Sequence, residues 1–267
     1  MYIGGKSAVE IADEFGTPVY VTDEQRVREN YRRIHGAFSR FMDTRVHYAC
    51  KANTNLAILS ILREEGAGID AVSIGEVMSC LKVGFTPDRI MYTGVNVSDA
   101  ELKAVSELGV MINLDSACEM ERLARIAPCS DVSFRITPGV GSGHSAKVTT
   151  GNKGAKFGIP LDQVISTYAR AKDLGFNIKG IHAHIGSGGQ VVEPFMDMME
   201  VLIELVNEIK GLGIDLEFID MGGGIGVPYK PQEEEMDVGE LAMNLTDMIQ
   251  EETDIDTIVL EPGRYIV

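Results

Sequence analysis

Short runs rich in β-branched residues alternate with helical patterns along the whole chain, and this alternation constrains the fold more than any other feature. It predicts parallel strands joined by crossover helices. We expect eight strands, the number that closes a (β/α)8 TIM barrel, and the 267 residues match the roughly 250 residues of such a domain. The expected strands are residues 46–50, 68–72, 89–93, 110–114, 131–136, 178–182, 216–220 and 257–260.

The segments between these strands carry helix start and stop signals. Ser98 with Glu101, and Ser116 with Glu119, have the spacing of a capping box. Asp23 is placed to cap a longer helix that ends near residue 38. Glycines suited to the left-handed position after a helix follow three apolar-periodic segments, at Gly66, Gly109 and Gly175.

Charge and composition exclude several classes of function. Forty acidic against 24 basic residues give a formal charge of −16, which disfavours nucleic acid and anionic membranes as partners. No apolar run reaches the ~20 residues of a spanning helix and no leader pattern opens the chain, so a cytoplasmic location is expected. The four cysteines form no CxxC pair, which argues against a zinc knot or a disulfide framework.

The chain is expected to form one barrel domain over residues 1–267. It stops at Val267, directly after the eighth expected strand, with no helix to cover that strand. This ending predicts a barrel that is truncated after strand eight. The 22-residue connection after the fifth strand, residues 137–158, is rich in Gly, Ser, Thr and Lys, and a loop of that length is typically functional.

Chemically distinctive residues follow the expected strands, where the loops of a barrel converge. Lys51 follows the first strand among apolar neighbours that are expected to lower the pKa of its amine, and a neutral amine can form a Schiff base. Taken alone, a lysine at a strand end is more often a solvated surface group. His182 and His184 lie two residues apart on one face of the sixth strand. Metal ligation by this pair is the alternative, but the further ligands of barrel metallohydrolases are lacking, and no metal is expected.

Two glycine-containing motifs indicate an anion site. Gly222-Gly223-Gly224 directly follows a strand and lets backbone N–H groups approach a phosphate, although a tight turn is equally compatible with it. Glu261-Pro262-Gly263-Arg264 brings a carboxylate, a stiff turn and a guanidinium together, or else forms a surface ion pair beside a turn. Together the two motifs outline a phosphate clamp.

In combination these motifs resemble the fold type III family of pyridoxal-phosphate decarboxylases, whose barrel is alanine racemase-like, and within it the diaminopimelate branch. The resemblance covers almost the whole chain. Its motifs are Gly-Thr-Pro-Val-Tyr-Val from Gly16, Tyr-Ala-Cys-Lys-Ala-Asn from Tyr48, Asp-Ala-Val-Ser-Ile-Gly-Glu from Asp70, Asp115-Ser116, Arg-Ile-Thr-Pro-Gly from Arg135, Lys-Phe-Gly-Ile from Lys156, His-Ala-His-Ile-Gly-Ser from His182, the triple glycine and Glu261-Pro262-Gly263-Arg264.

The resemblance implies pyridoxal 5'-phosphate as the cofactor. It implies three catalytic residues: Lys51, which carries the cofactor as a Schiff base, His184, which stacks on the pyridine ring, and Glu261. The carboxylate of Glu261 at the pyridine nitrogen would keep that nitrogen protonated and so favour decarboxylation over racemisation. The related alanine racemases have an arginine at this position instead. Arg264 also touches the substrate. The implied cofactor-binding set is Lys51, Asp70, His184, Ser187, Gly222, Gly223, Gly224, Glu261, Pro262, Gly263 and Arg264.

The implied activity is decarboxylation of meso-2,6-diaminopimelate to L-lysine and carbon dioxide, the last step of lysine biosynthesis. Residues 135–159 look like the diaminopimelate branch rather than the ornithine branch. The alternatives are an ornithine, arginine or carboxynorspermidine-type decarboxylase, or a non-catalytic pyridoxal-phosphate barrel. Family members form homodimers and carry a C-terminal β domain whose cysteine and tyrosine complete the site. Because nothing in this chain corresponds to that domain, the chain alone is expected to be inactive.

Overall fold

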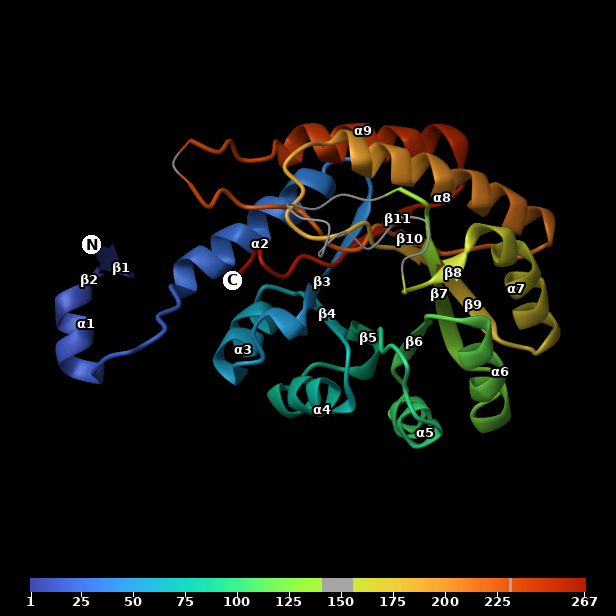
Figure 1. Cartoon of the computed structure of the whole chain (residues 1–267), viewed down its shortest axis with the longest axis horizontal. Helices are drawn as coiled ribbons and strands as arrows, with labels where there is room; N and C mark the ends of the chain where they lie inside the picture. Colours follow the sequence, from blue (N-terminus) through green and yellow to red (C-terminus); the bar gives the residue numbers. More distant parts are fainter. Residues whose placement is uncertain (141–155, 231) are drawn as a thin grey trace.

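A closed barrel of parallel strands forms the centre of the molecule (Figure 1). The computed structural model describes residues 1–140, 156–230 and 232–267. The strands follow the order β6-β5-β4-β3-β11-β10-β9-β7, and pairing of β6 with β7 closes the ring, which confirms the predicted eight-stranded TIM barrel. These strands are β3 (Asp43–Ala49), β4 (Gly68–Ala71), β5 (Ile90–Tyr92), β6 (Met111–Leu114), β7 (Asp131–Thr137), β9 (Asn177–Ala183), β10 (Phe218–Asp220) and β11 (Thr257–Leu260). The short β8 (Ile159–Pro160) pairs with β7 outside the ring.

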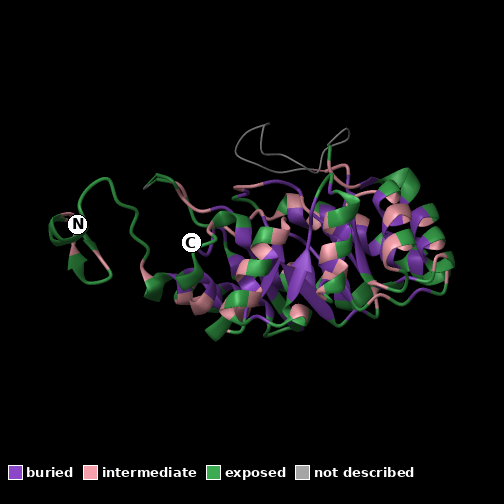
Figure 2. Cartoon of the chain, turned by 90° about the horizontal axis from the view of Figure 1, so that it is seen from below, coloured by how far each residue is buried: buried purple, intermediate pink, exposed green. Residues whose placement is uncertain are grey.

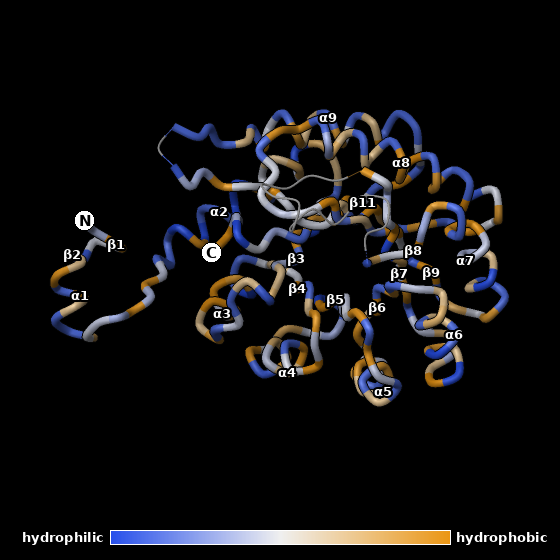
Figure 3. Tube along the Cα trace, in the orientation of Figure 1, coloured by the Kyte–Doolittle hydropathy of each residue, from blue (hydrophilic) through white to orange (hydrophobic). Residues whose placement is uncertain are grey.

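Helices surround the barrel, and their apolar faces pack on its outer surface. Hydrophobic and hydrophilic residues alternate along these helices, as expected for elements with one buried face (Figure 3). The helices after the strands are α3 (Leu56–Glu64), α4 (Ile74–Val83), α5 (Asp99–Glu107), α6 (Ala117–Ile126), α7 (Leu161–Asp173), α8 (Glu193–Gly211) and α9 (Val238–Glu252), with 3-10 turns η1 (Cys50–Ala52) and η2 (Pro87–Arg89). None of the described helices is long and apolar enough to cross a membrane.

Helix α2 (Glu24–Phe38) precedes the first barrel strand and completes the outer ring. It contacts α3 on one side and α9 on the other, and it buries Val27, Tyr31, Ile34 and Phe38. Helix α2, between α3 and α9, covers the barrel where β3 pairs with β11. The truncation expected after strand eight stays a prediction.

The helix caps follow the sequence signals only in part. Ser98 and Ser116 accept hydrogen bonds from the backbone N–H groups of Glu101 and Glu119, as expected. In neither capping box does the glutamate side chain bind the backbone N–H of the capping serine; its partner is a residue that precedes the serine in sequence. Glu119 accepts instead from the backbone of Asp115, and Glu101 accepts from the Tyr92 hydroxyl group. These carboxylates thus tie each helix start to the strand end before it. The glycine stops are confirmed, because all three adopt positive φ, at Gly66, Gly109 and Gly175.

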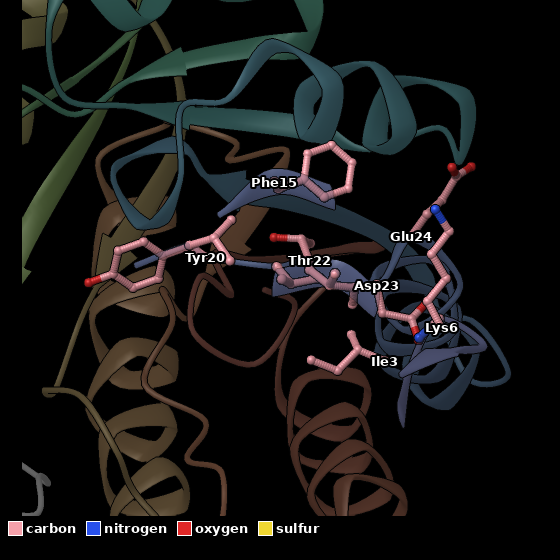
Figure 4. Close-up of a pocket in the computed structure, with 11 residues that line it drawn as sticks. Ile3, Lys6, Phe15, Tyr20, Thr22, Asp23 and Glu24 are labelled. Carbon is pink, nitrogen blue, oxygen red and sulfur yellow. The ribbon is translucent and has the colours of Figure 1, made fainter. Parts of the chain in front are cut away.

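The first residues form a small unit beside the barrel (Figures 1 and 2). It consists of the hairpin β1 (Tyr2–Ile3) and β2 (Lys6–Ser7) followed by α1 (Ala8–Phe15), whose start carries a complete capping box from Ser7 and Glu10. The unit encloses a hollow of about 480 Å³ whose lining residues all lie between Ile3 and Glu24 (Figure 4). This hollow is therefore separate from the mouth of the barrel.

The interior of the barrel is polar toward the carboxyl ends of the strands. Buried side chains that carry hydrogen-bonding or charged groups enter it from six strands: Asp70, Asn113, Ser133, His182, Asp220 and Glu261. Burying such groups is costly unless they are paired. Their partners therefore define what this end of the barrel can do.

Candidate active site

Most of the predicted site residues line one cavity at the carboxyl ends of the strands, whereas Asp70, Gly222, Gly223 and Pro262 are not among its lining residues. It has a volume of about 380 Å³, and its lining includes Lys51, His184, Ser187, Gly224, Glu261, Gly263 and Arg264. Lys51 and Glu261 come from opposite ends of the sequence but adjacent strands, β3 and β11, which pair in parallel. The barrel topology thus brings the amine and the carboxylate to the same mouth.

Lys51 lies in η1, directly after β3, and its Nζ is 2.8 Å from Oδ2 of Asp70. The register pairs Ala49 with Asp70, which places the carboxylate beside the turn that holds the lysine. Burial lowers the pKa of Lys51, but the charges of Asp70 and Glu261 outweigh it and the pKa lies above its ordinary value. The predicted lowering was wrong because apolar neighbours were considered without the two carboxylates inside the barrel.

Glu261 is buried at the end of β11, and its Oε2 lies 3.2 Å from Nε2 of His182. Burial alone would raise the pKa of this carboxyl group. The imidazole of His182 and the charge of Lys51 reverse that effect and hold the pKa well below its usual range. The other oxygen, Oε1, has no hydrogen-bond partner among the described residues. Glu261 is therefore an ionised carboxylate that lines the cavity and also faces the carboxyl group of Asp220.

His182 and His184 do not converge on a common ligand position in the described part of the chain. The side chains that do converge are His182, Asp220 and Glu261, whose potential ligand atoms lie within 4.8 Å of one another. His184 instead accepts a hydrogen bond at Nδ1 from the backbone of Gly223, at 3.2 Å. The metal alternative built on the His-x-His pair is therefore not supported by this geometry.

His184 is held as a neutral ring. Burial, together with the positive charges of Arg135 and Lys51, lowers its pKa to about 3. The backbone hydrogen bond from Gly223 fixes the orientation of the imidazole at the cavity. A neutral, anchored aromatic ring is suited to lie against a planar cofactor.

The triple glycine is required by backbone packing. A Cβ atom would lie 2.6 Å from the carbonyl oxygen of Ala183 at Gly222 and 2.3 Å from that of Glu261 at Gly223. At Gly224, which also has positive φ, it would lie 2.6 Å from the Gly186 oxygen. Two of the three N–H groups are used within the protein, because Gly222 donates to Asp220 and Gly223 to His184. The loop can thus offer an anion fewer backbone donors than the sequence suggested.

Two residues of the site carried no role in the sequence-based prediction. Tyr229 accepts a hydrogen bond from Arg264, whose guanidinium carbon lies 5.7 Å from the centre of the tyrosine ring. Arg135 is only 9% exposed near the end of β7, with its guanidinium carbon 4.8 Å from the centre of the Phe157 ring. A charged residue in an otherwise buried strand was a detectable signal for Arg135. Tyr229 lies in a long loop and had no such signal.

Comparison with known proteins identifies the family. Residues 24–267 match the family described as pyridoxal-dependent decarboxylase, pyridoxal binding domain. The chain belongs to this family. The diaminopimelate decarboxylase of Methanothermobacter thermautotrophicus is 50% identical over 275 residues, and the match covers 100% of this chain. That of Pseudomonas aeruginosa is 36% identical over 100% of the chain.

A solved structure gives the same result. The diaminopimelate decarboxylase of Helicobacter pylori, complexed with L-lysine, is 32% identical with a TM-score of 0.92 and is matched over 98% of this chain and 67% of its own. The chain spans 64% and 65% of the length of the two curated relatives. The chain therefore corresponds to a part of these longer proteins, the part that contains the pyridoxal binding domain.

The site fits the cofactor that the family name implies. Pyridoxal phosphate offers an aldehyde to an amine, a basic ring nitrogen to an acid, and a phosphate to hydrogen-bond donors. Lys51 supplies the amine, and the carboxylate of Glu261, which lines the same cavity, is an acceptor suited to a protonated ring nitrogen. Ser187, Gly224, Gly263 and Arg264 line the same cavity. Part of the segment 135–159, which supported the choice of the diaminopimelate branch, lies outside the described residues, at 141–155.

Proposed function

We propose that this chain is the cofactor-binding barrel of a carboxy-lyase that converts meso-2,6-diaminopimelate to L-lysine and carbon dioxide. The observation that carries the proposal is that Lys51 and Glu261 line one cavity at the carboxyl end of the barrel. A basic amine and an ionised carboxylate are the two groups that a pyridoxal-phosphate decarboxylase needs on opposite parts of the cofactor.

Each residue has a defined task in this proposal. When bound, pyridoxal phosphate supplies an electron sink for the carbon that loses the carboxylate. Lys51 would hold the cofactor covalently, and Oδ2 of Asp70, at 2.8 Å, is placed to accept the proton that the amine must lose. Glu261 would bind the ring nitrogen of the cofactor and keep its proton in place. His184, neutral and anchored by Gly223, covers the ring without adding charge.

The phosphate is assigned to the turn region of the same cavity. Ser187, Gly222 to Gly224, Pro262, Gly263 and Arg264 form this part of the cofactor site. The contact of Arg264 with Tyr229 supports its place at the edge of the cavity, where it also reaches the substrate. Arg135 adds a buried positive charge near the amine.

The choice of diaminopimelate rests on the relatives. The two curated relatives named above are diaminopimelate decarboxylases, and the Helicobacter pylori structure contains L-lysine, the product of that reaction. Decarboxylases of ornithine, arginine or carboxynorspermidine are the alternatives of the same fold. Carbon dioxide release from each of these amino acids by the full-length protein distinguishes them, and release from ornithine but not from diaminopimelate would reject the assignment.

Cofactor attachment can be tested on the chain itself. With pyridoxal phosphate, the wild-type chain should develop an absorbance band near the edge of the visible range, and borohydride should fix the cofactor to Lys51. Lys51→Ala should lose both signals, and Lys82→Ala, on an outer helix, should keep them. A band that persists in Lys51→Ala would refute the proposed site. If the wild-type chain binds the cofactor but the full-length protein releases no carbon dioxide from any of these amino acids, the non-catalytic alternative is indicated.

The assembly is also part of the proposal. Residues 1–267 act as one cofactor-binding unit in a cytoplasmic homodimer, and a β-rich domain completes the site in the longer protein. The length of the relatives supports this, because more than a third of each lies outside the match. The isolated chain is accordingly expected to bind cofactor and not to turn over. Sedimentation of the full-length protein tests the dimer.

A further inference from the structure

A chain of hydrogen bonds crosses the barrel behind Glu261. The Ser133 hydroxyl group donates to Oδ1 of Asn113 at 3.0 Å, and Nδ2 of Asn113 lies 2.9 Å from Nδ1 of His182. Nε2 of His182 lies 3.2 Å from Oε2 of Glu261. The four residues come from β7, β6, β9 and β11, and none is more than 6% exposed. We call these residues the interior relay.

The relay fixes the position of the imidazole proton. Because the amide oxygen of Asn113 accepts from Ser133, its amide nitrogen faces His182. An amide nitrogen only donates, so Nδ1 of His182 must accept and carries no proton. The ring proton is then on Nε2, and it is donated to Glu261.

We propose that His182 is a positioning residue that donates its Nε2 proton to Oε2 of Glu261, held in this tautomer by Asn113 and Ser133. The inference rests on the proposed function, in which Glu261 binds the ring nitrogen of the cofactor. One oxygen of the carboxylate is occupied by His182, and the carboxyl group of Asp220 also lies against Glu261. The relay thereby stabilises the ionised form of Glu261 and fixes its orientation at the cavity.

The same geometry argues against a metal ion at the cluster of His182, Asp220 and Glu261. Both imidazole nitrogens are occupied, Nδ1 by Asn113 and Nε2 by its own proton. Asp220 is fully buried, and burial together with the charge of Glu261 raises its pKa well above the ordinary value. A ring nitrogen that carries a proton is a poor metal ligand, and a raised pKa disfavours the ionised form of Asp220 that a metal ion would need.

The tautomer can be read without cofactor or activity. In the chain labelled with 15N at histidine, the ring nitrogens of His182 should show a proton on Nε2 and none on Nδ1. The signals are assigned by their loss in His182→Gln. A proton on Nδ1, whether in the other neutral tautomer or in an imidazolium ion, would overturn the relay. This result does not depend on whether the proposed function holds.

The consequence for Glu261 is tested by paired substitutions in the full-length holoenzyme. His182→Leu removes the donor and fills most of the volume, whereas His182→Gln retains an amide donor at a similar reach. We expect His182→Leu to lower kcat roughly 10- to 100-fold, the range typical of residues that orient a ligand group through a hydrogen bond. Its KM should change little, and the visible band of the cofactor should lose its protonated-ring form at lower pH than in wild type. His182→Gln should restore most of both properties.

His35→Leu is the control, because His35 lies on the outer helix α2, where its ring stacks on Tyr31 with centroids 5.8 Å apart. It should leave the cofactor spectrum unchanged. Thermal unfolding monitored by circular dichroism separates folding defects from the spectral effect. If His182→Leu folds, binds cofactor and keeps the wild-type spectrum and kcat, the relay has no positioning role although the proposed function stands. Failure of the Lys51 experiment would instead reject the function and leave the tautomer measurement valid.

Discussion

At the scale of single residues, the sequence indicated which groups meet at the mouth of the barrel but not how they are paired. Lys51, His184 and Glu261 were placed there because each follows a strand, and parallel strands deliver their carboxyl ends to one side. Their electrostatics depend on register, which the sequence does not display. The pairing of Ala49 with Asp70 puts a carboxylate 2.8 Å from the Lys51 amine and reverses the predicted direction of its pKa shift.

The pairing predicts a pH effect of Asp70→Asn. In wild type, Asp70 favours the charged amine and raises the pKa of Lys51, so the neutral form appears only at high pH. Removing this carboxylate leaves burial opposed by Glu261 without Asp70, and the pKa of Lys51 should fall. Covalent attachment of pyridoxal phosphate, trapped with borohydride, should therefore reach its midpoint at a lower pH in the variant. Asp88→Asn, at the opposite end of the barrel, should leave the midpoint in place, and an unchanged midpoint in Asp70→Asn would contradict the pairing.

At the scale of elements, the helix and strand positions followed from hydrophobic period and from capping residues. The caps at Ser98 and Ser116 formed as expected, but the carboxylates of Glu101 and Glu119 turned to other partners. A capping box is a local pattern, and a strand end that approaches in three dimensions can compete for the same oxygen. The glycine loop shows the same limit. Its sequence indicated an anion site, while its steric requirement comes from the carbonyl groups around it.

The loop geometry predicts a loss of stability in Gly223→Ala. The added Cβ would meet the Glu261 carbonyl oxygen at 2.3 Å, and both partners are backbone held in the barrel. This clash can be relieved only if the glycine loop shifts, and such a shift weakens the hydrogen bond from Gly223 to His184. We expect the free energy of unfolding to fall by about 1–3 kcal/mol and cofactor affinity to fall with it.

Urea unfolding and cofactor titration measure both effects of Gly223→Ala. Gly211→Ala is the control, since its Cβ would meet nothing within 4 Å and it ends helix α8, where alanine is favoured. Equal stability of the two variants would show that the loop adapts without cost.

At the scale of the whole molecule, the barrel was predictable because eight alternating units leave few other topologies. The covering of its last strand was not, because the helix that performs this task precedes the first strand in sequence. Helix α2 lies between α3 and α9, and Asn30 on α2 donates to the backbone oxygen of Ile266. Periodicity identifies a helix but does not say which strand it covers. Only the closed ring shows that the beginning of the chain protects its far end.

This arrangement predicts different effects of two truncations. Removing residues 1–22 should leave the melting temperature and cofactor binding of the barrel nearly unchanged, because the hairpin and α1 lie beside it (Figure 2). Removing residues 1–38 also removes α2, including Tyr31 and the fully buried Phe38. Loss of one such aromatic side chain typically costs 3–5 kcal/mol, so this shorter chain should fail to fold. Circular dichroism and thermal melts compare the two, and a folded chain without α2 would contradict the assigned role.

The docking of α2 against α9 also has a consequence for synthesis. The two helices are separated by about 200 residues of chain, and Arg33 on α2 binds Glu235 just before α9. On the ribosome, α2 emerges early and can pack on β3 and α3, but the side that contacts α9 lacks its partner until nearly the entire barrel has been translated. The contact between α2 and α9, which completes the outer ring of helices, therefore forms late and joins segments that are far apart in the sequence. Any chaperone that assists this protein would be needed for the exposed face of its first barrel helix.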